Sequence, residues 1–206
     1  CRKRKSKRKS NSKGQIMSDT RKQEIIEAAR TLYEKKGHAH TSVKDITDEC
    51  GIARSLFYHY FPDKHAVTSA VLDDYIADYI ESLRMWNAER EVGNIEHALD
   101  GVVKVLRMGV FQGSSFRRSL DTSENAALYL EFVNRVADQT TSYIIDTTVR
   151  DYAKLHDIKI EHIYETFYML ILGLCGYIRT HRNVPDEVLK CLIAQTLHME
   201  RLSELP

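Results

Sequence analysis

The chain has 206 residues, enough for one or two domains with a hydrophobic core. Its 43% hydrophobic and 29% charged residues exclude a chain that is disordered throughout or built from membrane spans. The formal charge of +1 hides an uneven distribution, because residues 1–13 carry eight basic side chains and no acidic one. The rest of the chain therefore holds 22 of the 30 basic and all 29 acidic side chains. A basic segment ahead of an acidic body hints at nucleic-acid contact.

Apolar runs, cysteines and prolines narrow the class further. No apolar run reaches the ~18 residues of a membrane span, and none follows the basic start as in a secretory signal. The four cysteines are scattered without a C-x-x-C pair, which is typical of free thiols in a reducing cytoplasm. Prolines stand only at positions 62, 185 and 206, so the long proline-free stretches predict an all-α chain.

The basic start, residues 1–18, is rich in Lys, Arg, Ser and Asn and is predicted to form a disordered arm. Met17 looks like an ordinary first residue, so residues 1–16 are interpreted either as an extension upstream of the native start or as a native arm. A native arm would lie along DNA phosphates or act only as a solubilising tail, and both interpretations stay open.

Three short helices are predicted next. The first runs over about 20–36, with apolar residues at helical spacing from Ile25 to Tyr33, and ends at Gly37. The second begins after Thr41 or Ser42 and ends before Gly51, and Asp45 stands in a capping-box-like position three residues after Ser42. The third covers about 53–61. Two short helices joined by a tight turn containing Gly predict a helix-turn-helix.

The third predicted helix has an apolar side and a polar side. Phe57 and Phe61 share the apolar side and are expected to pack on the first two helices. The opposite side and flanks offer Arg54, Ser55 and His59 together with tyrosines, groups suited to phosphates and to base edges in a major groove.

The landmarks from Ile25 to Gly37, from Thr41 to Ile46 and from Cys50 to Lys64 resemble the DNA-binding domain of the TetR family of transcriptional regulators. The resemblance implies an all-α fold, with a three-helix helix-turn-helix domain over residues 19–66 and a larger effector-binding and dimerising domain over 67–206. It implies a homodimer that reads double-stranded DNA. The DNA contacts it suggests are Thr41, Ser42, Lys44, Arg54, Ser55, Leu56, Tyr58, His59, Tyr60 and Lys64.

Three positions depart from the family pattern. Ala53 replaces the usual Ser, so the third helix lacks a side-chain N-cap, an omission that costs on the order of 1 kcal/mol. Leu56 stands where a smaller residue is common, and it either touches a thymine methyl or packs on the second helix. Tyr60 replaces the usual His and keeps a donor for phosphate.

Longer helices are predicted after residue 62, over about 63–88, 95–112, 124–156, 161–180 and 186–202, with a short segment at 116–120. The helix over 161–180 is apolar almost all round, so we expect its own domain to cover one side and a second copy the other. The last two helices then form a four-helix dimer interface. The interface residues expected are Phe167, Leu170, Gly173, Leu174, Gly176, Tyr177, Leu189, Leu192, Ile193 and Leu197.

A pocket for an apolar or aromatic small molecule is the further expectation for the C-terminal domain. An ordinary hydrophobic core explains the same aromatic and Met residues, and this alternative stays open. The candidate lining residues are Tyr79, Trp86, Met108, Phe111, Tyr129, Phe132 and Tyr168.

No pattern points to catalysis: the sequence has no Gly-rich phosphate loop, no H-E-x-x-H and no G-x-S-x-G. We expect no enzyme, no cofactor and no metal site, since the pair His38 and His40 alone does not make one. The sequence predicts a cytoplasmic bacterial regulator, in most such proteins a repressor, that a small molecule releases from a palindromic operator. The alternative is a TetR-like DNA-binding protein without an effector that acts through protein partners.

Overall fold

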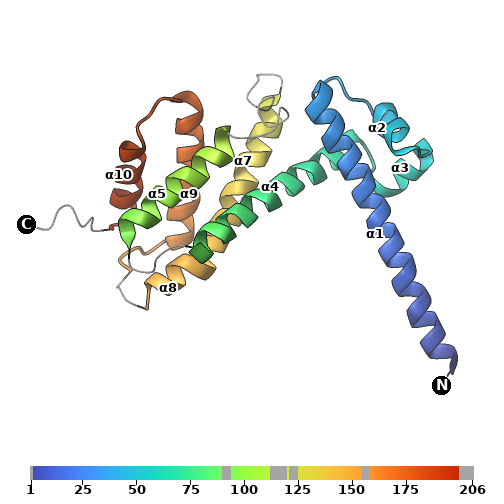
Figure 1. Ribbon diagram of the computed structural model, residues 1–206, viewed down its shortest axis with the longest axis horizontal. Coiled ribbons are helices and arrows are strands. Elements are labelled where there is room, and N and C mark those ends of the chain that lie inside the picture. Colours follow the sequence, from blue (N-terminus) through green and yellow to red (C-terminus); the bar gives the residue numbers. More distant parts are fainter. Residues whose placement is uncertain (1, 90–93, 112–119, 121–124, 155–157, 200–206) are drawn as a thin grey trace, which may run out of the picture. The chain divides into compact units, whose positions relative to one another are not determined.

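The computed structural model describes residues 2–89, 94–111, 120, 125–154 and 158–199, without the side chains of residues 2–18, 95 and 109–111 (Figure 1). Every regular element in these ranges is a helix, which confirms the all-α prediction. In the part described, no helix combines the length and apolar character needed to cross a membrane. The chain divides into two compact units, residues 1–74 and 75–206, here called the head and the body.

Helix α1 (Arg2–Lys36) is longer than expected. Ile25, Ala29 and Tyr33 are buried as the spacing predicts. The backbone is helical from Arg2 onwards, however, where the sequence led us to expect a disordered arm over 1–18. Lys and Arg are good helix formers, no proline precedes position 62, and extending a helix costs far less than starting one. These three conditions let α1 continue upstream of Thr20.

Helix α2 (Val43–Cys50) begins with the capping box that the sequence predicts. The Asp45 backbone N–H donates to Ser42 Oγ at 3.2 Å, and the Ser42 backbone N–H donates to Asp45 Oδ2 at 2.6 Å. Gly51 ends α2 in the left-handed region at φ 63°, a conformation that suits glycine because it has no Cβ. The turn leads directly into α3 (Arg54–Tyr60), whose N-cap residue, Ala53, makes no side-chain hydrogen bond, also as expected.

Helix α4 (Lys64–Glu89) belongs to both units, since the division falls between Asp74 and Tyr75. The boundary lies eight residues beyond the one expected at residues 66 and 67. The reason is that the first turns of α4 are part of the head: the Tyr33 hydroxyl lies 2.8 Å from Thr68 Oγ1, and Arg30 pairs with Asp74 at 3.6 Å. The head core also contains Ile25, Ala29, Ile46, Phe57, Phe61, Val67 and Val71, all buried.

The body continues with α5 (Ile95–Phe111), α7 (Ala126–Ile144), a π-helical turn η2 (Ile145–Val149), α8 (Arg150–Tyr152), α9 (Ile163–Thr180) and α10 (Asp186–Thr196). The helix predicted over 124–156 is therefore interrupted at η2, where the β-branched Thr147, Thr148 and Val149 follow one another. The last helix ends at Thr196 and not at 202, because His198 takes the left-handed conformation at φ 49°. The segment predicted at 116–120 lies outside the described residues except Leu120, which is buried.

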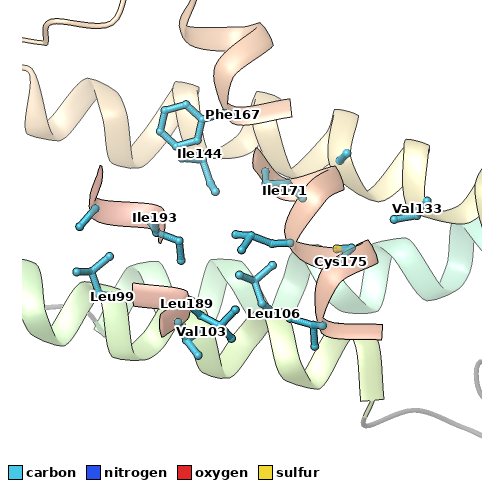
Figure 2. Close-up of a cluster of buried hydrophobic side chains, with 14 residues drawn as sticks. Leu99, Val103, Leu106, Val133, Ile144, Phe167, Ile171, Cys175, Leu189 and Ile193 are labelled. Carbon is cyan, nitrogen blue, oxygen red and sulfur yellow. The ribbon is translucent and has the colours of Figure 1, made fainter. Parts of the chain in front are cut away.

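The main core of the body lies between α5, α7, α9 and α10 (Figure 2). Leu99 and Val103 of α5 meet Leu189 and Ile193 of α10 there. Two ion pairs join the same helices: Arg107 Nε lies 2.6 Å from Asp186 Oδ1, and Lys190 pairs with Asp100. The remaining members of the cluster are Leu106, Val133, Ala137, Ile144, Phe167, Ile171, Leu174, Cys175, Ile178 and Ala194.

Candidate nucleic-acid interface

The polar side of α3 is exposed in the head. Arg54, Ser55, Tyr58 and His59 are exposed, and Tyr58 shows 54% of its surface to solvent. Phe57 on the opposite side is fully buried and anchors the helix. We call the four exposed residues the α3 face; it presents a cation, a hydroxyl, a phenol and an imidazole.

Leu56 and Tyr60 flank the α3 face and are half-buried. The Tyr60 ring meets the His59 ring edge-on, with 5.0 Å between the ring centroids. Half-buried Leu56 is compatible with both predictions made for it, contact with a thymine methyl and packing on the second helix. Both residues therefore lie beside the α3 face and not in its centre.

Of the two phosphate contacts predicted at the start of α2, only one has an exposed side chain. Thr41 is buried, and its hydroxyl donates to the Gly37 carbonyl at 2.8 Å, so the predicted phosphate contact by this side chain conflicts with its placement in the core. Ser42 is exposed, but its hydroxyl donates to Asp45 Oδ2 at 2.6 Å. The bonds from Ser42, together with Lys36, hold the pKa of Asp45 well below its usual range. A carboxylate that stays charged at this point disfavours a phosphate directly beside it.

The two predicted lysine contacts differ from each other. Lys44 is exposed and lies 3.8 Å from Asp48 in a surface pair of the kind that contributes little. Lys64 is half-buried, and its Nζ donates to the His38 carbonyl at 2.6 Å. Burial lowers the pKa of Lys64. Lys64 thus holds the loop after α1, a structural role that the sequence did not reveal.

A buried polar cluster supports this end of the head. Thr68 Oγ1 lies 2.8 Å from the Tyr33 hydroxyl and 3.1 Å from His38 Nε2, and the rings of Tyr33 and His38 meet edge-on at 5.1 Å. Burial raises the pKa of Tyr33 to about 12. The sequence did not reveal the cluster, because Thr68 lies 35 residues from Tyr33 and 30 from His38 and shares no local pattern with them.

The His38 imidazole makes the stability of the head depend on pH. Burial, assisted by the positive charges of Lys64 and His65, lowers the pKa of His38 from 6.5 to about 4. The unfolded chain takes up a proton near pH 6.5, whereas the folded head resists it until about pH 4. The contribution of neutral His38 is thus complete above pH 6.5 and is lost as the pH falls towards 4.

We expect His38→Gln to flatten the fall of the melting temperature between pH 6.5 and 4, a window set by the two pKa values of His38. His40→Gln is the matched control, since His40 is exposed in the same loop. Melting curves across this pH range measure both variants. Equal slopes for wild type and His38→Gln contradict the assignment.

The seven candidate ligand residues of the body do not converge on one point. Tyr79 is buried in a cluster of α4, α5 and α7, against which Trp86 and Phe132 pack. Tyr129 and Tyr168 pack against the main core instead. The Arg179 guanidinium lies 3.9 Å from the Tyr129 ring centroid, and the Tyr168 hydroxyl donates to Asn134 at 3.1 Å. Met108 is half-buried, and the side chain of Phe111 lies outside the described residues.

The predicted dimer residues fall into two groups. Four of them, Phe167, Leu174, Leu189 and Ile193, are buried within the body and are not available to a partner. For these four residues the predicted dimer contact is wrong, because α5, α7 and α10 together cover more of α9 than one side. Gly173, Tyr177 and Leu192 are exposed, and Leu170, Gly176 and Leu197 are half-buried. Exposed Met169 and Val188 were not predicted; each lies one turn before Gly173 of α9 or Leu192 of α10. The exposed residues Met169, Gly173 and Tyr177 are here called the stripe of α9, and Val188 and Leu192 the stripe of α10.

Groups of three or more His, Cys, Asp or Glu side chains placed to hold a metal ion are absent from the residues that the structure describes. Of the ten predicted DNA contacts, six are exposed on the head: the four residues of the α3 face together with Ser42 and Lys44. A short helix with a buried back and an exposed polar face, preceded by a capped helix and a glycine turn, defines a helix-turn-helix DNA-binding protein.

Comparison with known proteins gives the family. Residues 25–71 match the family model described as bacterial regulatory proteins, tetR family. The match places the segment that contains α2 and α3 in a tetR-family DNA-binding domain. The uncharacterized HTH-type transcriptional regulator YuxN of Bacillus subtilis is 29% identical over 134 residues, which cover 63% of this chain and 45% of that protein. The HTH-type transcriptional repressor KstR2 of Mycolicibacterium smegmatis is 24% identical over 138 residues, covering 66% and 61%.

Solved structures share the fold over both units. The transcriptional repressor QsdR of R. erythropolis superposes with a TM-score of 0.61 at 15% identity, over 89% of this chain and 97% of that chain. RolR in complex with resorcinol superposes with a TM-score of 0.58 at 17% identity, over 89% of each chain. The curated relatives are matched over less of their length, at most 61% for the two named above.

Proposed function

We propose that the protein is a DNA-binding transcriptional regulator that reads its operator with the α3 face. The observation that carries this proposal is the contrast within one short helix between buried Phe57 and the exposed Arg54, Ser55, Tyr58 and His59. A recognition helix needs such a contrast, because its back must be fixed to the domain while its front enters a major groove. The tetR-family match over residues 25–71, which include α2 and α3, supports the proposal.

The groups of the α3 face divide between the two kinds of DNA contact. Arg54 offers a fork of donors that pairs with the O6 and N7 acceptors of a guanine. The phenol of Tyr58, which is 54% exposed, suits a phosphate oxygen, as do Lys44 and the hydroxyl of Ser55. Residues 20–68 carry eight basic and seven acidic side chains, so affinity must come from the placement of these donors and not from bulk charge.

The proposal extends to assembly and regulation. Two copies joined through the exposed stripes of α9 and α10 would present two α3 faces to a palindromic operator, with half-sites about one helical turn apart or somewhat more.

A small molecule in the body would release the operator by binding the DNA-free conformation with higher affinity than the DNA-bound one. KstR2 is named a repressor, and RolR was solved with resorcinol, which supports repression and a small effector for this chain.

Arg54→Ala is expected to relax the base preference at one operator position and to cost about 1–3 kcal/mol there, because the bidentate contact with a guanine is lost. Tyr58→Ala is expected to weaken binding to all sequences alike. Selection of bound DNA from a random pool measures the first effect, and titration at several salt concentrations the second. Arg84→Ala is the matched control, since Arg84 is exposed on α4 in the body and pairs with Glu81. An unchanged base preference for Arg54→Ala contradicts the proposal.

A further inference from the structure

The eight basic side chains at the start of the chain take no part in the contacts proposed for the α3 face. They stand within residues 2–13, here called the basic segment, and the first acidic residue of the chain is Asp19. The rest of the chain holds 22 basic and 29 acidic side chains. The basic segment therefore concentrates eight positive charges in a protein whose other residues carry a net negative charge.

The basic segment belongs to α1, the helix that packs against α2 in the head (Figure 1). Further along α1, Lys22 Nζ lies 5.7 Å from the centroid of the Phe61 ring, directly after α3. The Glu24 carbonyl accepts a hydrogen bond of 3.7 Å from Cys50 Sγ, at the end of α2. This turn of α1 thus lies beside the ends of both α2 and α3, and the basic segment continues the same helix upstream.

The length of α1 gives the basic segment a reach that suits DNA next to the reading helix. With a rise of about 1.5 Å per residue, Lys13 lies roughly 14 Å and Arg2 roughly 30 Å upstream of Lys22 along the helix axis. One turn of DNA measures about 34 Å. The basic segment is therefore long enough to reach phosphates up to about one turn away from the groove that α3 enters.

The charges of the basic segment disfavour the helix that carries them. The first turn of α1 has no acidic residue, and positive charges there oppose the positive end of the helix dipole. Arg4 and Arg8 carry like charges one turn apart, as do Lys5 and Lys9, and such pairs also destabilise a helix. Phosphates placed along the basic segment neutralise both effects. A polyanion therefore stabilises this part of α1 when it binds.

The composition of the basic segment favours DNA over a membrane surface as its partner. Residues 2–15 contain no apolar side chain, and the first one upstream of the head is that of Ile16. A helix that lies in a membrane surface needs an apolar face to enter the lipid. Duplex DNA requires only clustered positive charge, because it carries one negative charge per roughly 1.7 Å of its axis. It is also the polymer that the α3 face is proposed to read.

We propose that the basic segment binds the phosphates of the DNA that flanks each half-site and so adds affinity that does not depend on sequence. The inference rests on the proposed function, because the α3 face places the head on the operator. The remainder of the head, residues 20–68, is nearly neutral, with eight basic and seven acidic side chains. The basic segment supplies the electrostatic part of the affinity that the head lacks, and the α3 face supplies the base preference.

The test compares the full chain with a variant in which Arg4, Lys5, Arg8 and Lys9 are replaced by glutamine, a residue with a similar helix propensity. Fluorescence anisotropy at several salt concentrations measures binding to the selected operator with about one turn of flanking DNA on each side, and to a random duplex of equal length. The slope of log K against log salt is expected to flatten by about 2–4, since each phosphate contact contributes about 0.9. Affinity is expected to fall by the same factor for both duplexes.

Two controls show whether the position of the charges matters. The first replaces Arg84, Lys104, Arg150 and Lys154 by glutamine, which removes the same numbers of arginines and lysines from exposed positions of the body. This variant is expected to keep the salt slope of the wild type. The second control is an operator duplex trimmed to its two half-sites. Wild type and the variant of the basic segment are expected to bind it alike, because the flanking phosphates are missing.

Hydrogen exchange of the backbone amides tests whether the basic segment itself meets the DNA. Exchange over residues 2–13 is expected to slow when the wild type binds the flanked operator, since phosphates stabilise the helix there. With the trimmed operator this exchange is expected to stay as fast as in the free protein. A solubilising tail without a DNA contact would show the same exchange in all three states.

Four results overturn the inference: an unchanged salt slope for the variant of the basic segment, an equal loss of affinity on the trimmed operator, unchanged exchange over residues 2–13, or tighter binding to vesicles of anionic lipid than to the random duplex. The role of the α3 face is decided separately, by the base preference of Arg54→Ala. The salt slope on random DNA needs no base reading, so failure of either proposal is distinguishable from failure of the other.

Discussion

Phe57→Ala is expected to destabilise the head by about 3–5 kcal/mol, which is the usual cost of truncating a buried phenylalanine. Phe57 is fully buried, and its ring lies 5.8 Å from that of Phe61 between centroids. Domains are stable by only about 5–15 kcal/mol, so most of this margin would be lost. Urea unfolding followed by circular dichroism measures the change, and DNA binding is expected to fall with it.

Tyr58→Ala is the matched control for this prediction. Tyr58 is the next residue of α3 and is 54% exposed, so its removal is expected to leave stability within about 0.5 kcal/mol while weakening DNA binding. The two neighbours thus separate the structural side of α3 from the reading side. A stability loss for Tyr58→Ala equal to that of Phe57→Ala would contradict the orientation of α3.

Gly173→Leu is expected to convert a dimer into a monomer. A Cβ added at Gly173 or Gly176 meets no atom within 4 Å in the single chain, so the leucine fits the protomer. At a symmetric helix contact the same side chain would enter the partner twice, and overpacking costs about 1–3 kcal/mol for each copy. Sedimentation at several concentrations measures the change, and binding to a two-half-site operator is expected to fall.

Ala127→Leu is the control for the dimer prediction, because Ala127 is an exposed small residue on α7 and not on α9 or α10. It is expected to sediment as the wild type does. A wild type that is monomeric at all concentrations, or a Gly173→Leu variant that stays dimeric, contradicts the assignment of the interface. Unchanged melting of Gly173→Leu under monomeric conditions checks that the protomer remains folded.

Local patterns in the sequence predicted the head well. The spacing of Ile25, Ala29 and Tyr33 indicated the buried side of α1, and the capping box of Ser42 and Asp45 is present as expected. These features depend on residues within one or two turns of each other. The partners of Thr41 and Lys64 are backbone carbonyls, of Gly37 and His38, which only the folded loop places within reach. The sequence therefore suggested both side chains as DNA contacts without showing the bonds that they make within the head.

In the body, too, local sequence patterns did not show which residues of the same chain pack together. The apolar character of α9 was evident, but the sequence did not show how many helices of the same chain cover it. Leu174, Leu189 and Ile193 were expected at a dimer contact and lie in the protomer core, where α5 and α10 also meet. Half-buried Trp86 was predicted as a pocket residue from its aromatic character, whereas its contact with Gly101 depends on the packing of α4 on α5.

The missing cap at Ala53 has a consequence for energetics. Helix α3 has seven residues, and its N-cap residue Ala53 gives no side-chain hydrogen bond to its first turn. The buried ring of Phe57 lies further along the helix. A serine at position 53 would add about 1 kcal/mol of helix stability. Without it, part of the free energy of DNA binding goes into ordering the reading helix, and operator affinity becomes linked to the helix–coil equilibrium of seven residues. A substitution in α3 at a residue that does not contact DNA can then raise or lower the affinity for every operator alike.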